Sequence, residues 1–468
     1  MVNRRKSSAP RVRPPLVRQQ LGRALVAMAV IGMGAALLAT ACTNGRNESP
    51  ATVVQPVRAA STSEPQDRAE MAAVSATAAL TLAAVPVTAE ARLLRVIQLV
   101  AWQELDAALQ AAAQLTEDVP NFLAAQLVYA DLLRFKTGRH AGLAASPGAG
   151  VTELPAKKVS VAPKAGEEQP LDWQDQMHGL RKELERRVHG SSFSPPAGSI
   201  PREFQLLGAS VRHALAIDAS KSRLYVFSNE QGQLRLIADY YVSIGKLGMG
   251  KSQEGDQRTP QGVYFIGRQI AGAKLPDFYG KGALTLNYPN DWDKAQDRSG
   301  DGIWLHGSPP DQFARLPQAS DGCIVLANPD LLTLMKTVDR QTPVVLSDKL
   351  QWDVPSDRLP EKAADAFVPV LDAWQQAWTQ ADPRVLAQMY EQDPTSEQFA
   401  KARLTELFRF SDVSLQNLSV YAWKDLETDI RIVDAQIGSK KAGRFQPLRQ
   451  YWRKSGGHWE IFSEEVRG

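Results

Sequence analysis

The sequence predicts an exported protein with three folded parts: a short α-helical module, a mainly-β domain and a C-terminal α+β domain. Three observations support this prediction. A basic segment followed by an apolar run opens the chain. Hydrophobic residues recur at helical spacing from residue 89 and alternate from about residue 211. Beyond residue 361, two helical stretches precede a series of strand-like stretches, an order typical of α+β domains.

Shifts in composition place the predicted boundaries between these parts. Intervals rich in Ala, Pro, Gly, Ser and Thr without periodicity are typical of linkers. The predicted parts are a signal peptide (1–41), a flexible tether (42–88), the helical module (89–136), a linker with a charged helix (137–210), the mainly-β domain (211–348), a linker (349–361) and the α+β domain (362–468).

The first 41 residues have the features of an export signal. They carry seven basic groups and no acid, and end in the apolar run Ala24 to Ala41. The sequence Ala39-Thr40-Ala41-Cys42 suits ordinary signal peptidase, and it also resembles the box before a lipid-modified cysteine in bacterial lipoproteins. An uncleaved anchor helix is a third interpretation, because eighteen apolar residues can just span a bilayer. We favour lipidation of Cys42, which gives this cysteine a role.

Export changes the meaning of the net charge. Removing the seven basic groups of the signal region from the formal charge of +3 leaves −4 for the rest of the chain. The basic character therefore belongs to the targeting segment, and we expect no nucleic-acid partner. Contact with a membrane is expected only through the N-terminal lipid or anchor.

The helical module and the mainly-β domain differ in period. Between residues 89 and 136 the apolar residues follow amphipathic helices, and the pattern resembles one to one and a half tetratricopeptide (TPR-like) hairpins. From residue 211, β-branched and aromatic runs alternate with turn signals, which predicts strands such as "GVYFIGRQI", "GIWLHG", "GCIVL" and "TPVVLSD". The stretch from Ile270 to Gly300 is long for a connection and predicts a lid or binding loop.

The residues that suggest chemistry are His306 and Cys323. In an oxidising compartment an unpaired thiol risks oxidation, and Cys323 has no partner if Cys42 is lipidated. A nearby imidazole can accept the thiol proton and form a Cys/His pair, if the strands that carry the two residues are neighbours. Amide groups near Gly322 and Cys323 are candidate oxyanion donors. A buried, inert cysteine is the alternative, because spacing alone is weak support.

The motifs around this pair resemble those of the L,D-transpeptidase family, also called the YkuD fold. The residues that carry the resemblance are "HG" at His306, "SDGCIVLANPD" from Ser320, "VSIGK" at 242–246 and "RTPQGVYFI" at 258–266. The stretch "LNYPNDWDKAQDRSGDGIWLHG" resembles the proteobacterial branch with an extended lid. The resemblance covers roughly residues 211 to 348 and implies a YkuD-like catalytic domain.

The resemblance also implies roles for individual residues. Cys323 would be the nucleophile, His306 its base, and the Gly307 carbonyl would orient the imidazole. Ser320 and Gly322 would shape the turn and the oxyanion site. Two residues depart from many members: Asp321 stands where a second histidine is common, and Val325 where an arginine is common. The residues that we expect, less specifically, to contact substrate are Asp321, Asn328, Tyr288 and Trp292.

The implied activity is peptidoglycan L,D-transpeptidation in the periplasm of a Gram-negative envelope, with the chain anchored through its lipid. A tetrapeptide stem would be the acyl donor, releasing its terminal D-alanine. The acceptor stays open: a second stem, an envelope-lipoprotein lysine, a D-amino acid or water, the last giving a carboxypeptidase or amidase. A non-catalytic envelope scaffold is the alternative. No cofactor and no metal are expected.

The C-terminal domain, 362–468, resembles the NTF2-like cone fold. Its aromatic residues are expected to form either core or the lining of an apolar pocket. For the helical and NTF2-like modules we expect docking to the wall, to envelope lipoproteins or to wall-synthesis proteins.

Overall fold

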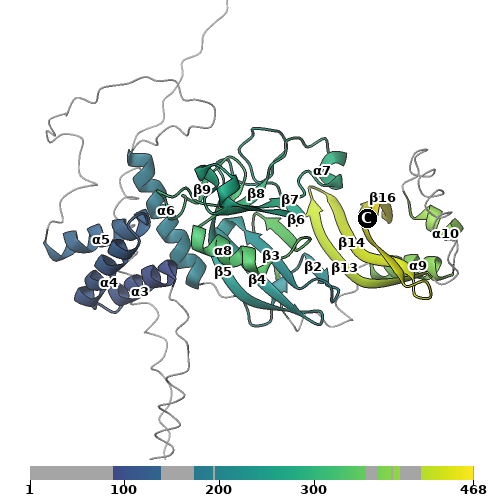
Figure 1. Ribbon diagram of the computed structural model, residues 1–468, viewed down its shortest axis with the longest axis horizontal. Coiled ribbons are helices and arrows are strands. Elements are labelled where there is room, and N and C mark those ends of the chain that lie inside the picture. Colours follow the sequence, from purple (N-terminus) through teal and green to yellow (C-terminus); the bar gives the residue numbers. More distant parts are fainter. Residues whose placement is uncertain are drawn as a thin grey trace, which may run out of the picture. The chain divides into compact units, whose positions relative to one another are not determined.

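The computed structural model describes residues 88–138, 173–192, 195–354, 367–380, 383–390 and 413–466. The predicted signal peptide, Cys42 and nearly all of the predicted tether lie outside these residues. The chain divides into two compact units, one reaching to Glu117 and resuming at Tyr129–His140, the other comprising Asp118–Val128 and Ala141–Gly468. The elements of both units are labelled in Figure 1.

The smaller unit contains helices α3 (Ala89–Ala101) and α4 (Leu105–Asp118, up to Glu117) and the later part of α5 (Leu123–Lys136). Thr88 caps α3 by accepting a hydrogen bond from the backbone of Ala91 at 3.1 Å. Helix α5 is joined to α4 by the Lys136–Asp106 ion pair. The helical character predicted for 89–136 is confirmed. None of the helices in the described parts of the chain is long and apolar enough to cross a membrane.

Helix α6 (Trp173–Ser192) belongs to the larger unit and is the predicted charged helix. It buries an ion pair: the Arg187 guanidinium lies 2.8 Å from Glu183, and both side chains are almost inaccessible. The guanidinium also stacks on Tyr241, with its Cζ atom 3.8 Å from the ring centroid. The buried face of α6 includes this charged pair. Charged residues are rarely buried, so hydrophobic periodicity did not predict that this face of the helix is packed.

The mainly-β domain is built on a nine-stranded sheet in the order β10-β8-β7-β6-β11-β3-β4-β5-β9. Strand β10 also pairs with β5, which closes the sheet back on itself. Its strands are β3 (His213–Asp218), β4 (Arg223–Glu230), β5 (Gln233–Gly245), β6 (Gly262–Ala271), β7 (Gly282–Leu286), β8 (Trp304–Gly307), β9 (Gln318–Ser320), β10 (Ile324–Leu326) and β11 (Pro343–Ser347).

Short helices occupy the connections of this sheet. They are η1 (Ala219–Lys221), η2 (Gly272–Lys274), η3 (Asp277–Tyr279), α7 (Asp291–Ala295) and α8 (Asn328–Thr337). The strand runs predicted from the sequence are confirmed. The long stretch from Ile270 to Gly300, predicted as one loop, instead contains β7 together with η2, η3 and α7.

Two hydrophobic clusters cover the sheet. In one, Leu331 and Leu334 of α8 pack with strand residues such as Leu305 and Ile324. In the other, Phe265 and neighbouring residues pack against the C-terminal sheet. The mainly-β domain and the C-terminal sheet therefore share a core.

In the described residues of the C-terminal part, two helices precede an antiparallel sheet, as predicted for an α+β domain. Its sheet has the order β16-β15-β14-β13-β2, so β2, which precedes the mainly-β domain, supplies one edge (Figure 1). Its elements are α9 (Val368–Thr379), α10 (Pro383–Gln388), β13 (Val413–Asp425), β14 (Thr428–Ser439), β15 (Arg444–Ser455), β16 (His458–Val466) and β2 (Phe204–Leu206).

Two findings refine the sequence-based outline. The interval 137–210, predicted as a linker with a helix, also contains β2 and β1 (Ile200–Pro201), which pairs with β12 (Trp352–Asp353). The aromatic residues that the sequence placed either in a pocket or in the core lie in the core: Trp374, Trp378, Tyr390 and Trp452 are all buried in one cluster.

Candidate active site

His306 lies in β8, and Cys323 immediately precedes the adjacent strand β10. Strands β8 and β10 pair in parallel, and His306 lies opposite Val325. Cys323 precedes Val325 by two residues, and residues two apart along an extended chain point to the same face. Tyr279 lies beside His306, with 5.1 Å between their ring centroids, and burial raises the pKa of its phenol, with a smaller contribution from Cys323. The neighbouring strands expected from the sequence are therefore present.

The His306 imidazole is fixed in one tautomer. Its Nδ1 lies 2.8 Å from the carbonyl oxygen of Gly307. A carbonyl only accepts, so Nδ1 carries the proton and Nε2 is left as the basic atom. The side chain is 1 % exposed, and this burial lowers the pKa of the imidazole to about 4, with the charge of Arg315 acting in the same direction. His306 is therefore a neutral base at any pH above about 5.

A tight turn holds the backbone before Cys323. Ser320 Oγ donates to the carbonyl of Cys323 at 2.6 Å and accepts from the Gly322 amide at 3.2 Å. Thr259 Oγ1 donates to the Gly322 carbonyl at 2.9 Å. Gly322 has φ +128°, and a Cβ at this position would lie 2.7 Å from the Arg258 carbonyl oxygen, so only glycine fits here. The Gly322 amide, a candidate oxyanion donor, already has Ser320 as its partner.

The Cys323 thiol is hydrogen-bonded to the backbone of Gly302. Its Sγ donates to the carbonyl oxygen of Gly302 at 3.3 Å, and no hydrogen bond joins it to His306 within the described residues. Burial raises the pKa of the thiol, with Asp321 acting in the same direction, while the Trp304 backbone, Arg315 and Lys251 oppose the rise. The pair is therefore neutral in this resting arrangement.

Aromatic and cationic side chains that the sequence did not assign to catalysis surround the pair. The ring centroid of Phe278 lies 5.8 Å from that of His306. The Arg315 guanidinium lies over the Phe278 ring, with its Cζ atom 4.4 Å from the ring centroid. Tyr279 also packs on Trp304 at 5.0 Å. Arg315 is only 5 % exposed, although it belongs to the connection between His306 and Cys323. A buried arginine in a loop carries no periodic signal, so only the fold reveals it.

Asp321, predicted as a weak substrate contact, is paired within the protein. Its carboxylate lies 3.1 Å from Lys246 Nζ and accepts from Gln257 Nε2 at 3.2 Å. The Asp321 side chain remains 58 % exposed. The acid that replaces the family's histidine is therefore partly neutralised by Lys246 at the surface beside the nucleophile turn.

Asn328 is engaged with backbone groups. Its Oδ1 accepts from the Lys281 amide at 2.8 Å, and its Nδ2 donates to the Ser308 carbonyl at 2.8 Å. A Cβ on Gly307 would lie 2.1 Å from Asn328 Oδ1, so Gly307 permits this close approach. Asn328 thus ties together the segments on both sides of the His306 strand, which is the structural role that the sequence left open.

The two aromatic residues predicted to contact substrate lie in the interior. Tyr288 and Trp292 are 5 % and 4 % exposed. The Tyr288 hydroxyl donates to the Ser299 carbonyl at 3.1 Å, and Trp292 Nε1 donates to Asp425 of the C-terminal sheet at 2.6 Å. Trp292 thus joins a loop to the neighbouring sheet, and contact of these two residues with substrate stays a prediction.

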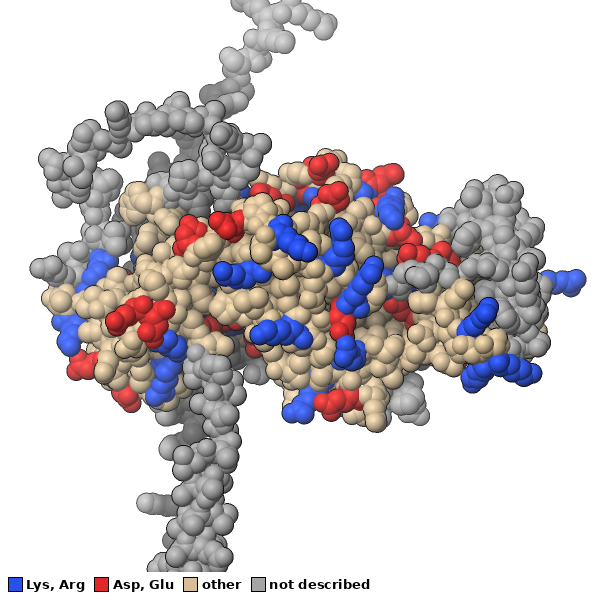
Figure 2. All heavy atoms as spheres, in the orientation of Figure 1, with Lys and Arg blue, Asp and Glu red and all other residues tan. Residues whose placement is uncertain are grey.

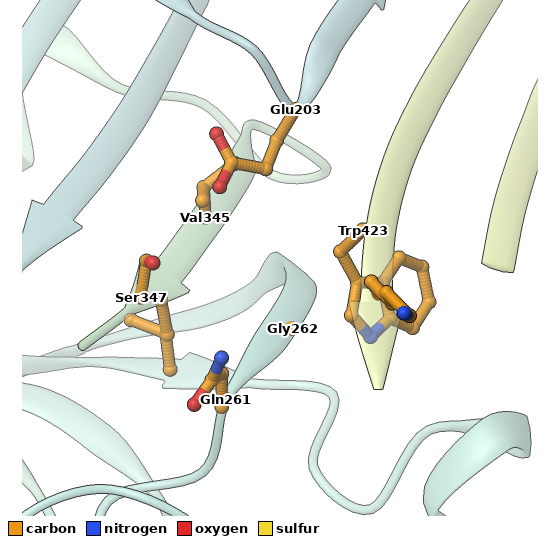
Figure 3. A pocket seen from close by; sticks show the side chains of 8 residues that line it. Glu203, Gln261, Gly262, Val345, Ser347 and Trp423 are labelled. Carbon is orange, nitrogen blue, oxygen red and sulfur yellow. The ribbon is translucent and has the colours of Figure 1, made fainter. Parts of the chain in front are cut away.

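A separate cavity of about 70 Å³ lies between the C-terminal strand β13, the strands β6 and β11, and the turn that joins β1 to β2. Glu203, Gln261, Ser347 and Trp423 are among its lining residues (Figure 3). It contains neither His306 nor Cys323. On the face shown in Figure 2, basic and acidic side chains lie interspersed and form no single uninterrupted basic patch.

Comparison with known proteins finds relatives of the domain that contains His306 and Cys323. Residues 212–346 match the family model of the L,D-transpeptidase catalytic domain, YkuD. The chain is 30% identical over 119 residues to the putative L,D-transpeptidase YafK of Escherichia coli strain K12, covering 25% of this chain and 46% of that protein. The same figures hold for YafK of Escherichia coli O157:H7. The chain thus spans about half the length of these curated relatives.

Solved structures are similar at lower identity. Bd1075 of Bdellovibrio bacteriovorus is 24% identical, with a TM-score of 0.47, 57% of this chain and 98% of that chain being covered. The helical cell shape determining protein Pgp2 of Campylobacter jejuni is 23% identical, with a TM-score of 0.44 and coverage of 60% and 100%. The match of residues 212–346 to the family model identifies the mainly-β domain that carries His306 and Cys323 as a YkuD-like domain of the L,D-transpeptidase family.

Proposed function

We propose that the protein is a peptidoglycan L,D-transpeptidase with Cys323 as nucleophile and His306 as base. The observation that carries this proposal is the fixed tautomer of His306, whose Nδ1 is held by Gly307 on a strand adjacent to the Cys323 turn. This leaves a neutral, basic Nε2 for the thiol proton. The match of residues 212–346 to the L,D-transpeptidase catalytic domain supports the same activity.

The reaction begins when the thiol exchanges its hydrogen bond to Gly302 for one to His306 Nε2. The imidazole takes the proton as sulfur attacks the carbonyl of the third residue of a stem tetrapeptide. The bond to the terminal D-alanine then breaks, and the proton from His306 passes to the departing amine. This leaves a thioester on Cys323.

In the second half of the reaction an acceptor amine attacks the thioester. His306 takes the proton of the amine, the carbon–sulfur bond breaks, and the thiol is restored. An amine of a second stem gives a 3→3 crosslink, and a lysine of an envelope lipoprotein or a D-amino acid gives an attached or exchanged product. Water in the same place gives a carboxypeptidase or amidase, which is the alternative within the same chemistry.

The experiment is mass spectrometry of the purified protein incubated with disaccharide-tetrapeptide fragments. The wild type should release D-alanine and carry a covalent acyl adduct, while Cys323→Ala should do neither. Cys42→Ala, which removes the other cysteine, is the matched control and should behave as the wild type. Absence of both turnover and adduct in the wild type, also with a carbapenem as acylating probe, would favour the non-catalytic scaffold.

The location follows from the predicted signal. We propose that the chain is exported to the periplasm and held at a membrane by a lipid on Cys42, with the helical and NTF2-like modules docking to wall or envelope proteins. Metabolic labelling with a palmitate analogue tests this: the wild type should be labelled, and Cys42→Ala should not. Labelling of neither protein would contradict the lipoprotein interpretation.

A further inference from the structure

The connection from β7 to β8, residues 287–303, joins the C-terminal sheet to the catalytic thiol, and we name it the β7–β8 arm. At one end, Trp292 Nε1 donates to Asp425 Oδ2 at 2.6 Å, and the Arg298 guanidinium donates to the same oxygen. Ser463 of β16 donates to Asp291 Oδ2 at 2.5 Å. The arm is therefore attached to two strands of the C-terminal sheet, at the last residue of β13 and within β16.

These attachments are sheltered from solvent. Trp292 is 4 % exposed and its ring packs on Phe462 at 5.6 Å between centroids. The side chains of Arg298 and Asp425 are 16 % and 18 % exposed. Arg298 also donates to Asp293 at 3.1 Å, so it links the short helix α7 to Asp425. Charge-assisted hydrogen bonds in such surroundings are stronger than those at an open surface.

The other end of the arm holds the thiol. Three residues separate Arg298 from Gly302, whose carbonyl accepts the Cys323 thiol at 3.3 Å. Ser299 is fixed within this span, because its amide donates to the Ser252 carbonyl at 3.1 Å and its own carbonyl accepts from Tyr288 at 3.1 Å. Four steps of chain reach at most about 14 Å, so the Gly302 carbonyl cannot lie far from the Arg298 attachment.

We propose that Asp425 is a positioning residue of the active site: through Trp292 and Arg298 it fixes the β7–β8 arm, and so the C-terminal sheet determines how firmly the Gly302 carbonyl holds the Cys323 thiol. The proposal rests on the proposed function for its catalytic meaning. Its effect on the thiol can be measured whether or not the protein turns over peptidoglycan.

The hydrogen bond to Gly302 favours the protonated thiol, because a carbonyl oxygen can accept from S–H but repels a thiolate. The charged groups that act on the thiol are Arg315, Lys251 and Asp321, and none of them belongs to the arm. A change at Asp425 therefore leaves those charges in place and alters the thiol through the arm.

The test is the rate of alkylation of Cys323 by iodoacetamide between pH 6 and 10, in a Cys42→Ser background so that one thiol reacts. Asp425→Ala should lower the apparent thiol pKa. A fall of one unit gives about tenfold more thiolate at pH 7, and the accompanying loss of nucleophilicity reduces the gain to about threefold in rate. Asp425→Glu, which keeps the charge, should restore most of the wild-type profile.

Asp434→Asn is the matched control. Asp434 pairs with Arg449 of the same sheet, and Arg449 also reaches the mainly-β domain by stacking on Phe265. This variant disturbs a second contact between the same two sheets without touching the arm, and its alkylation profile should match the wild type. Trp292→Phe is a milder second variant that keeps an aromatic side chain and removes the Nε1–H donor, and it should shift the profile in the same direction as Asp425→Ala.

The outcomes separate this proposal from the proposed function. If Asp425→Ala and Trp292→Phe are folded by circular dichroism and alkylate with the wild-type pH profile, the positioning role is refuted even if the wild type is an active transpeptidase. If the profile shifts while no turnover is seen in any variant, the positioning role stands and the proposed function fails. With an active enzyme, Asp425→Ala should change kcat more than KM, because the arm acts on the nucleophile.

Discussion

Glu203 provides a prediction that links the cavity of Figure 3 to stability. Its carboxylate lies in the turn between β1 and β2 and lines that cavity with Gln261, Ser347 and Trp423. Burial raises the pKa of Glu203 from 4.5 to about 7, with Asp353 and Asp218 adding to the rise and Arg202 opposing it. Its Oε2 atom is buried and has no hydrogen-bond partner among the described residues.

The magnitude follows from the difference between the folded and unfolded pKa values. Below pH 4.5 the carboxyl is protonated in both states, so it adds nothing to the pH dependence of stability. As the pH rises towards 7, the unfolded chain ionises while the folded chain keeps its proton, so the free energy of unfolding falls. A difference of about 2.5 units corresponds to a loss of about 3 kcal/mol, complete once the pH exceeds about 7.

The perturbation is Glu203→Gln, which keeps the shape of the side chain and removes the ionisation. Urea unfolding of the wild type and the variant at pH 5 and pH 8 measures the effect. The stability of the variant relative to the wild type should increase by about 2–3 kcal/mol from the lower to the higher pH. The exposed Glu230 of β4 offers the control Glu230→Gln, which should keep the pH dependence of the wild type. Parallel pH dependences of Glu203→Gln and the wild type would refute the reasoning.

Two further predictions concern the active site. The kcat/KM for D-alanine release should stay level down to about pH 5 and fall only near pH 4 on the acid side, because the His306 pKa is lowered to about 4; an acid limb at pH 6–7 would contradict this. Gly322→Ala should destabilise the protein by about 1–3 kcal/mol in thermal unfolding, because a Cβ there meets the Arg258 carbonyl at 2.7 Å. Gly255→Ala, at φ +75° with no atom within 4 Å, should cost less, and equal losses would show that the contact with Arg258 is unimportant.

The sequence was sufficient for much of the fold because alternation marks half-buried strands directly. The strands of the mainly-β domain and the four C-terminal strands appear where β-branched and aromatic residues alternate between turn signals. Strand β7 was missed because Gly282–Leu286 is short and lies in a stretch rich in Gly, Asp and Asn. Strand β2 was missed because three residues carry no measurable period.

The site could be predicted only in part, since a motif indicates which residues react and not how their neighbours hold them. The sequence indicated that His306 and Cys323 lie at two strands, whereas the pairing of those strands and the hydrogen bond of the thiol to Gly302 come from the structure. Trp292 was expected beside a substrate because aromatic residues in a long loop often line grooves. Its contact with Asp425 is made across 133 residues of sequence, and no local pattern encodes such a contact.

The position of β2 at the edge of the C-terminal sheet has a consequence for the order of folding. Leu206 pairs with Val420, so this edge closes a loop of 214 residues that contains the whole mainly-β domain. Closing so long a loop is slow compared with forming hairpins, and it cannot begin before β13 has been synthesised. Until then, Phe265 and the other aromatic residues of the shared core have no cover. We expect the chain to be most prone to aggregation during this interval, and a chain ending near residue 361 to aggregate.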